Sequence, residues 1–376
     1  MKKLNVIMIL IDGGRLDHVL KSDFYQNLKS DFSFFSHPIT YGPHTIAAMH
    51  AIFSGCYGTR TGTDSYWSTY NFKKNEFKTL TDYFHENNYH TVCDIVNKLV
   101  IPEKNFDEFL IHDEQKDDLA TRHSNLLEKL KEKNNSGQNF FSFFQFSNIH
   151  TGIMNEVLKV YDNFSEDYFS NKELNKIRYQ KLFNKSEIYL KQILEKIHSL
   201  DLEKDTLILI MSDHGISIGE KIGERAYGAF CYDYTLRTFA YLKFPNMQKH
   251  HIDQQIRTID FMPTILDILE IELDKNYEAL DGESLLPMLK GEQLTEKFAF
   301  SETGNPLMDS KPPKTPNTKS IRTSKWKLIL NEYDNSKEFY DLENDPNEEE
   351  NLIGKNTELE KKFMDELSQY LKTSTY

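Results

Sequence analysis

Short apolar runs recur along the chain, and several of them end on polar side chains. The segments Asn5–Asp12, Asn139–Phe146 and Thr206–Asp213 are rich in Val, Ile, Leu, Met or Phe, with few polar residues inside them. A run of this length is typical of a strand that is buried on both faces of a parallel sheet. Shorter strands are expected at Ser33–His37 and Thr91–Val96.

Between these runs, several segments have the composition of helices, and in Asn171–Leu200 the apolar residues also recur at roughly helical spacing. The pattern predicts helices over Thr45–Phe53, Leu80–Asn87, Arg122–Lys133 and Asn171–Leu200. Gly55 favours the end of the first of these helices. Because strands alternate with helices, we expect an α/β fold with a mostly parallel sheet that is flanked by helices.

The pattern changes near residue 290. Ser320–Leu330 and Glu338–Leu342 resemble antiparallel strands, and Thr357–Tyr370 resembles a charged closing helix. We therefore predict a large α/β domain over residues 1–290 and a smaller carboxyl-terminal α+β subdomain over residues 291–376.

Charge limits the partners of the protein. The chain has 376 residues and a formal net charge of −13, which argues against binding to nucleic acid or to an anionic membrane, since both need a basic surface. A small anionic substrate is still compatible with this charge, because a bound metal ion can dominate the local field. Assembly as a homo-oligomer stays open.

The cysteines and the amino-terminal run indicate the compartment. Cys56, Cys93 and Cys231 are sparse and form no disulfide framework, as expected of free thiols in a reducing compartment. The apolar run Val6–Ile11 ends at Asp12 and has no cleavage pattern of a signal peptide. No apolar stretch approaches the roughly 18–20 residues of a membrane span. We therefore expect a cytoplasmic protein.

Two of the apolar runs stop on side chains that bind metal ions. Asp12 ends the first run, and Asp213 and His214 end the run that begins at Thr206. In open α/β sheets, ligands bind outside the carboxyl ends of the strands. These side chains can therefore meet in one crevice. Oxygen and imidazole ligands suit a divalent ion such as Mn²⁺ or Zn²⁺, or a harder ion such as Ca²⁺.

Thr45 is a candidate for chemistry at the same place. It follows the Gly42-Pro43 turn and opens a predicted helix. Backbone N–H groups and the helix dipole favour an anion at such a position. A threonine at a helix start can equally serve as an N-cap, so the position alone leaves both roles open.

Several segments, taken in order along the chain, resemble the sulfatase-like branch of the alkaline phosphatase superfamily. The segments that carry the resemblance are Asp12–Asp17, Thr45–Gly62, Ser212–Gly215, Arg257–Asp267, Asp281–Gly291, Ile321–Lys327 and Phe339–Pro346. The resemblance covers nearly the whole chain. It implies a catalytic α/β domain followed by the smaller subdomain.

The resemblance assigns roles to particular residues. It places Thr45 at the position of the nucleophile and implies one divalent metal ion, held by Asp12, Asp213, His214 and the Thr45 oxygen. His150 aligns with a substrate-side histidine that contacts a non-bridging oxygen or protonates the leaving group. The alternative for His150 is a hydrogen-bonded loop histidine. The candidate substrate-binding residues are His150, Asn148, Lys221 and Arg225.

The chain departs from the sulfatase pattern at the nucleophile. Sulfatases carry Cys or Ser in a C/S-x-P-x-R motif and convert it to formylglycine, whereas this chain has Thr45, Ala47 and Met49. Cys56 lacks the proline of that motif and follows the predicted helix. A threonine has no second hydroxyl with which to expel sulfate. The departure therefore favours phosphoryl over sulfuryl chemistry.

A second departure concerns the number of metal ions. Sulfatases place a second aspartate directly after the first, where this chain has Gly13. Members with two metal ions place an aspartate four residues before a mid-chain histidine, where this chain has Phe146 before His150. One metal ion is therefore expected.

The resulting hypothesis is a metal-dependent hydrolase of phosphate or phosphonate esters, a phosphodiesterase-like enzyme, that acts through a phospho-threonine intermediate. Three alternatives remain: a phosphotransferase that passes the group to a sugar or glycerol hydroxyl, a sulfatase, and a non-catalytic binding protein that keeps the fold. In each enzymatic case the substrate is a small anionic ester.

Overall fold

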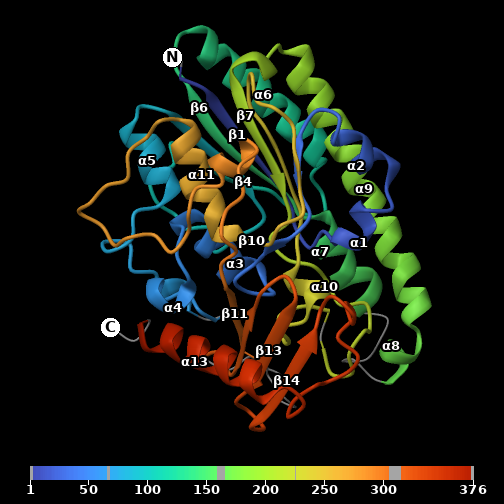
Figure 1. Ribbon diagram of the computed structural model, residues 1–376. Coiled ribbons are helices and arrows are strands. Elements are labelled where there is room, and N and C mark those ends of the chain that lie inside the picture. The colour runs from blue at the N-terminus through green and yellow to red at the C-terminus, as the bar shows by residue number, and fades with distance from the viewer. Residues whose placement is uncertain (1–2, 66–67, 159–165, 225, 305–314, 374–376) are drawn as a thin grey trace.

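The computed structural model describes residues 3–65, 68–158, 166–224, 226–304 and 315–373. In this part of the chain, the main sheet has eight strands in the order β5-β4-β6-β1-β7-β8-β2-β9 (Figure 1). The adjacent strands β5, β4, β6, β1 and β7 run parallel to one another. The next strand, β8, is antiparallel to both of its neighbours, β7 and β2. The predicted α/β class with a mostly parallel sheet is confirmed.

The strands of the main sheet are β1 (Asn5–Ile11), β2 (Ser33–Phe35), β4 (His90–Ile95), β5 (Glu108–Ile111), β6 (Phe140–Phe146), β7 (Thr206–Met211), β8 (Ala240–Lys243) and β9 (His251–Ile252). A separate two-stranded ladder joins β3 (Pro38–Ile39) and β10 (Ile256–Arg257). The five predicted strands correspond to β1, β2, β4, β6 and β7, with ends that differ by one or two residues. The short strands β5, β8 and β9 were not anticipated.

The helices are α1 (Leu16–Val19), α2 (Asp23–Leu28), α3 (Thr45–Ser54), α4 (Gly58–Thr61), α5 (Leu80–Glu86), α6 (Leu119–Asn135), α7 (Asn148–Gly152), α8 (Glu166–Ser170), α9 (Lys172–Ser199), α10 (Asp233–Leu236), α11 (Phe261–Ile268), α12 (Leu286–Leu289) and α13 (Thr357–Thr373). The four predicted helices correspond to α3, α5, α6 and α9. The helix α6 begins three residues before its predicted start, because Asp118 caps it by accepting hydrogen bonds from the Ala120 and Thr121 N–H groups.

Helices cover both faces of the main sheet (Figure 1). Every residue of β1 is buried. Ile7, Ile9 and Ile11 pack in the core beneath α2, α6 and α9, whereas the alternate residues of β1 pack in the core beneath α3, α5 and α11. Burial on both faces explains why this strand is an unbroken apolar run.

The carboxyl-terminal subdomain is a four-stranded antiparallel sheet with α13 against it (Figure 1). Its strands are β11 (Ala299–Thr303), β12 (Thr318–Arg322), β13 (Trp326–Asn331) and β14 (Ser336–Asp341). The prediction of a single strand over Ser320–Leu330 is wrong. The chain turns back between β12 and β13, where the Thr323 hydroxyl accepts a hydrogen bond from the Trp326 N–H group at 3.2 Å. The turn lies in the short polar run Arg322–Lys325, which contains neither glycine nor proline and so carries no strong turn signal.

The subdomain shares a core with α3. Ala47 and Ala51 of α3 belong to the same apolar cluster as Ile321, Leu328 and Phe339 of the antiparallel sheet. The domain boundary predicted at residue 290 lies between α12 and β11 and stays a prediction. Among the described residues, no helix combines the length and the hydropathy that are needed to cross a membrane.

Candidate active site

The site is built where two neighbouring strands end. β1 and β7 are parallel neighbours, and Leu10 pairs with Met211. Asp12 lies just beyond the end of β1, and Asp213 and His214 lie just beyond the end of β7. This register brings side chains that are about 200 positions apart in the sequence to one edge of the sheet.

The structure brings Asp12, Thr45, Asp213 and His214 together. The Thr45 Oγ1 atom lies 3.4 and 3.5 Å from the two Asp12 carboxylate oxygens and 3.1 Å from His214 Nε2. His214 Nε2 is 3.7 Å from Asp12 Oδ1 and 3.5 Å from Asp213 Oδ2. One ligand atom from each of Asp12, Asp213 and His214 can be chosen so that all lie within 4.8 Å of one another.

Thr45 does not serve as the N-cap of α3. His44 has the extended backbone of an N-cap residue, and its Nδ1 atom accepts a hydrogen bond from the Ala47 N–H group at 3.4 Å. Thr45 is the first helical residue, so its hydroxyl is available to the carboxylates and to His214. The interpretation of Thr45 as an N-cap is therefore wrong.

Burial sets the electrostatics of the site. Burial, together with the neighbouring Asp213, raises the pKa of Asp12 to about 6. Burial likewise raises the pKa of Asp213 to about 6 and lowers the pKa of His214. Two buried carboxylates this close repel each other when both are ionised, and a cation between them relieves that repulsion.

The donor set fits a divalent cation. Asp213 Oδ1 accepts hydrogen bonds from the Gly13 and His214 N–H groups, whereas the buried Oδ2 has no hydrogen-bond partner. His214 Nδ1 lies 2.8 Å from the Gly215 carbonyl oxygen, which leaves Nε2 directed at the carboxylates. Two carboxylates, an imidazole nitrogen and a hydroxyl suit Mn²⁺ or Zn²⁺, and the oxygens also suit Ca²⁺.

The backbone at Gly13 disfavours a second aspartate beside Asp12. Its φ is +71°, and a Cβ atom at this position would lie 2.6 Å from Ile216 Cδ1. A side chain here would therefore strain the backbone, and the Ile216 side chain would have to shift.

A cavity of about 380 Å³ opens beside the four side chains. The residues that line it are Asp12, His44, Thr45, Ile46, Tyr70, Val96, Asn97, Leu99, Val100, Glu114, Gln145, His150 and Tyr227. His150 Nε2 lies 2.6 Å from the Tyr227 hydroxyl, and His150 Nδ1 lies 3.9 Å from Glu114 Oε2. His150 and Thr45 therefore line the same cavity.

The other predicted substrate-binding residues do not line this cavity. Asn148 opens α7 and lines a separate hollow with residues of α6 and α9. The Lys221 ammonium donates a hydrogen bond to the Glu348 carbonyl and lies 4.8 Å from the centroid of the Tyr232 ring. The loop after β7 therefore carries Lys221 to the carboxyl-terminal subdomain. Arg225 lies outside the described residues.

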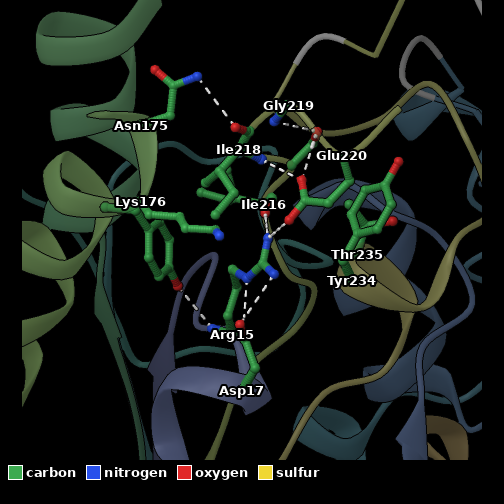
Figure 2. A network of polar contacts seen from close by, with 12 residues as sticks. Arg15, Asp17, Asn175, Lys176, Ile216, Ile218, Gly219, Glu220, Tyr234 and Thr235 are labelled. Carbon is green, nitrogen blue, oxygen red and sulfur yellow. Dashed lines mark hydrogen bonds and ion pairs between the residues drawn. The ribbon is translucent and has the colours of Figure 1, made fainter. Parts of the chain in front are cut away.

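Arg15 holds the loops around the site in place and does not line the cavity (Figure 2). Its guanidinium donates to the Ile216 carbonyl at 2.7 Å and pairs with Glu220 at 2.6 Å and Asp17 at 2.9 Å. Tyr179 of α9 donates its hydroxyl hydrogen to the Gly13 carbonyl at 2.8 Å. These bonds tie the loop after β1 to the loop after β7.

Several cavity residues were missed by sequence reasoning. Gln145 donates to Asp12 Oδ2 at 2.6 Å and accepts from the Val96 N–H group at 2.9 Å. It is a polar residue near the end of an apolar strand, which is the signal that identified Asp12. Glu114 and Tyr227 come from loops and had no such signal.

Cys56 is buried and its pKa is raised to about 12, mainly by burial, so its thiol is not a nucleophile at neutral pH.

Comparisons with known proteins place the chain in a family. The pattern of the family described as Sulfatase matches residues 5–271, and that described as N-sulphoglucosamine sulphohydrolase, C-terminal, matches residues 227–374. The chain is 30% identical over 165 residues to the uncharacterized sulfatase YidJ of Escherichia coli, covering 43% of this chain and 31% of that protein. It is 28% identical over 204 residues to human arylsulfatase K, and the match covers 51% of this chain and 36% of that protein.

Solved structures agree on the fold. A putative sulfatase from Bacteroides thetaiotaomicron matches with a TM-score of 0.77 at 19% identity, covering 99% of this chain and 93% of that one. The phosphonate monoester hydrolase SpPMH from Silicibacter pomeroyi matches with a TM-score of 0.74 at 15% identity, covering 99% and 95%. The chain spans about a third of the length of the curated relatives named above. Because the family pattern covers most of the chain, this protein belongs to the sulfatase family.

Proposed function

We propose that this protein is a metal-dependent hydrolase of phosphate or phosphonate esters in which Thr45 Oγ1 is the attacking atom. The observation that carries the proposal is the position of this oxygen, 3.1 Å from His214 Nε2 and 3.4 Å from Asp12 Oδ1 at the wall of the cavity. A bound divalent cation would neutralise charge on the ester and lower the pKa of a nearby hydroxyl.

In the proposed reaction, different residues of this chain attack the ester, bind its anionic group and protonate the departing oxygen. Thr45 Oγ1 attacks phosphorus while the alcohol leaves, and the hydroxyl proton passes to the Asp12 carboxylate 3.4 Å away. Water then cleaves the phospho-threonine, which restores the Thr45 hydroxyl and releases the phosphate or phosphonate. The start of α3 presents backbone N–H groups to the anionic group. His150, which is held by Tyr227 at 2.6 Å, supplies a proton to the departing oxygen.

The identity of residue 45 favours phosphorus over sulfur. Formylglycine carries a second hydroxyl that can expel sulfate, and a threonine cannot be converted to it. A phospho-threonine, in contrast, is opened by attack of water on phosphorus. The similarity in fold to a phosphonate monoester hydrolase is compatible with this proposal.

Substitution of Thr45 tests the proposal. We expect Thr45→Ala to lower kcat/KM for aryl phosphate diesters and phosphonates by at least about 10³-fold, because the covalent route is lost. The variants are compared at saturating metal, because the Thr45 oxygen is also a candidate ligand. Thr45→Ser, which keeps a hydroxyl, is the matched control and retains measurable activity. Full diesterase activity in Thr45→Ala, with metal content unchanged, would exclude Thr45 as the nucleophile.

Sulfate ester hydrolysis is the second candidate, and the family supports it. The relatives of this chain include an arylsulfatase and a choline-sulfatase. This candidate predicts turnover of aryl sulfates that exceeds turnover of aryl phosphate diesters and phosphonates. A side-by-side kinetic screen of aryl phosphate monoesters and diesters, phosphonates and sulfates separates the two candidates.

The same screen addresses the remaining alternatives. A phosphotransferase would transfer the group to added glycerol or a sugar, and the new ester would be found by product analysis. A binding protein that keeps the fold would cleave none of these esters. In that case Asp12, Thr45, Asp213 and His214 would have a binding role only.

A further inference from the structure

A second group of metal-binding side chains lies outside the cavity. Asp94 of β4, His112 after β5 and His123 of α6 are all fully buried at their side chains. One ligand atom from each can be chosen so that all lie within 4.8 Å of one another. The reaction proposed above uses none of these three residues.

One ring nitrogen of His112 and one of His123 face the same carboxylate oxygen of Asp94. His112 Nδ1 lies 2.7 Å from Asp94 Oδ1, and His123 Nε2 lies 3.9 Å from the same oxygen. His123 Nε2 is buried and has no hydrogen-bond partner. A buried polar atom without a partner is costly, so this nitrogen points to a missing ligand.

The other ring nitrogen of each histidine, and the other carboxylate oxygen of Asp94, each have a partner that orients the side chain. His112 Nε2 lies 2.9 Å from Ser147 Oγ, and His123 Nδ1 lies 2.6 Å from the Tyr189 hydroxyl. Histidines that bind metals usually donate their second N–H group in this way, which leaves the near nitrogen as the lone-pair donor. The Arg122 guanidinium donates to Asp94 Oδ2 at 2.5 Å.

We propose that Asp94, His112 and His123 bind a Zn²⁺ ion. Two imidazole nitrogens and one carboxylate oxygen are ligands that zinc prefers, and a non-protein ligand completes the tetrahedron. Arg122 opposes a cation, but its side chain is about a third exposed and also lies 3.5 Å from Asp117, which reduces this opposition. A hard ion such as Ca²⁺ or Mg²⁺ would find too few oxygens.

The ion would connect three walls of the cavity. Asp94 precedes the wall residue Val96 by two positions, and His112 precedes Glu114 by two. Ser147, the partner of His112, precedes His150 by three. A zinc ion here therefore has a structural role, because it holds together the segments that shape the cavity.

Metal stoichiometry tests the proposal independently of any ester cleavage. Purified protein that has been equilibrated with Zn²⁺ and desalted is expected to hold two zinc ions per chain by elemental analysis. His123→Gln is expected to hold one, and Asp12→Asn, which lacks a ligand of the candidate active site, is expected to keep the ion at Asp94. The matched control His18→Gln changes a buried histidine outside both groups and keeps two.

Two further measurements distinguish a loss of zinc binding from misfolding of the His123→Gln variant. Tyr189→Phe removes only the partner of His123 and is expected to weaken zinc binding about 10- to 100-fold in competition with a chelator. Co²⁺ is expected to give visible absorption of a tetrahedral site in Asp12→Asn and to lose it in the double variant Asp12→Asn/His123→Gln. If the stoichiometry and the chelator competition are the same in wild type, His123→Gln and Tyr189→Phe, the three residues form a hydrogen-bonded network only and the proposal is wrong.

Discussion

At the scale of single residues, the candidate active site depends on how each donor is held. Asp12 and Asp213 are buried carboxylates, and both are oriented by hydrogen bonds from neighbouring groups. Gln145 is the side chain that connects Asp12 to the cavity wall, since it bonds to both Asp12 Oδ2 and the Val96 N–H group. Partners of this kind tune the affinity of a metal site nearly as much as the ligands do.

Replacing Gln145 tests this role. Gln145→Leu keeps the approximate size of the side chain but leaves Asp12 Oδ2 and the Val96 N–H group without their partner. We expect metal affinity at the candidate active site to fall about 10- to 100-fold, as measured by competition with a chelator. Gln138→Leu, at an exposed position, is the control. Equal affinities in both variants would show that Gln145 does not orient Asp12.

At the scale of secondary-structure elements, the site depends on two loops that are held by one buried guanidinium. Arg15 follows β1, and its partners Ile216 and Glu220 follow β7 (Figure 2). The Arg15 side chain is only 8% exposed and that of Glu220 only 16%. Removing one partner of such a pair leaves a charge that is poorly solvated and unpaired.

We therefore expect Arg15→Met to destabilise the protein by about 3 kcal/mol, measured as the free energy of unfolding in urea. The double variant Arg15→Met/Glu220→Gln should recover part of this loss, because it removes the unpaired carboxylate as well. If the double variant is no more stable than Arg15→Met, then loss of the Ile216 contact, and not the Glu220 charge, accounts for the effect.

At the scale of the whole molecule, the carboxyl-terminal subdomain is joined to the α/β domain through buried polar contacts. Tyr370 of α13 donates to Glu302 of β11 at 2.8 Å, and its hydroxyl also lies 2.7 Å from Thr59 Oγ1 of α4. Burial raises the pKa of Glu302 from 4.5 to about 7. The junction between the two parts of the protein therefore contains a carboxyl group that prefers to be neutral.

This shift predicts how stability depends on pH. Between about pH 4.5 and 7 the unfolded chain releases the Glu302 proton while the folded protein keeps it, so this residue lowers stability as pH rises. Glu302→Gln does not titrate and can still accept from Tyr370. We expect it to gain about 2 kcal/mol relative to wild type between pH 5 and pH 8, measured by urea unfolding. A difference that is constant over this range would contradict the buried, neutral carboxyl.

Much of the fold follows from local patterns. The five predicted strands of the main sheet were unbroken or alternating runs, and their burial on one or both faces is what makes such runs visible. The same patterns could not reveal β5, β8 and β9, which are two to four residues long. The turn between β12 and β13 was also missed, because the polar run Arg322–Lys325 is short and contains neither glycine nor proline.

The ends of β1 and β7 could be placed together from the order of residues alone, because neighbouring parallel strands end at the same edge of a sheet. That rule accounts for Asp12, Asp213 and His214. The rule does not predict the positions of side chains on long loops. Lys221 is close to His214 along the chain, yet its ammonium group contacts the Glu348 carbonyl. The grouping of Asp94, His112 and His123, and the cavity wall that includes Glu114 and Tyr227, arise only when β4, β5, α6 and α7 pack together, since contacts between distant loops leave no periodic trace in the chain.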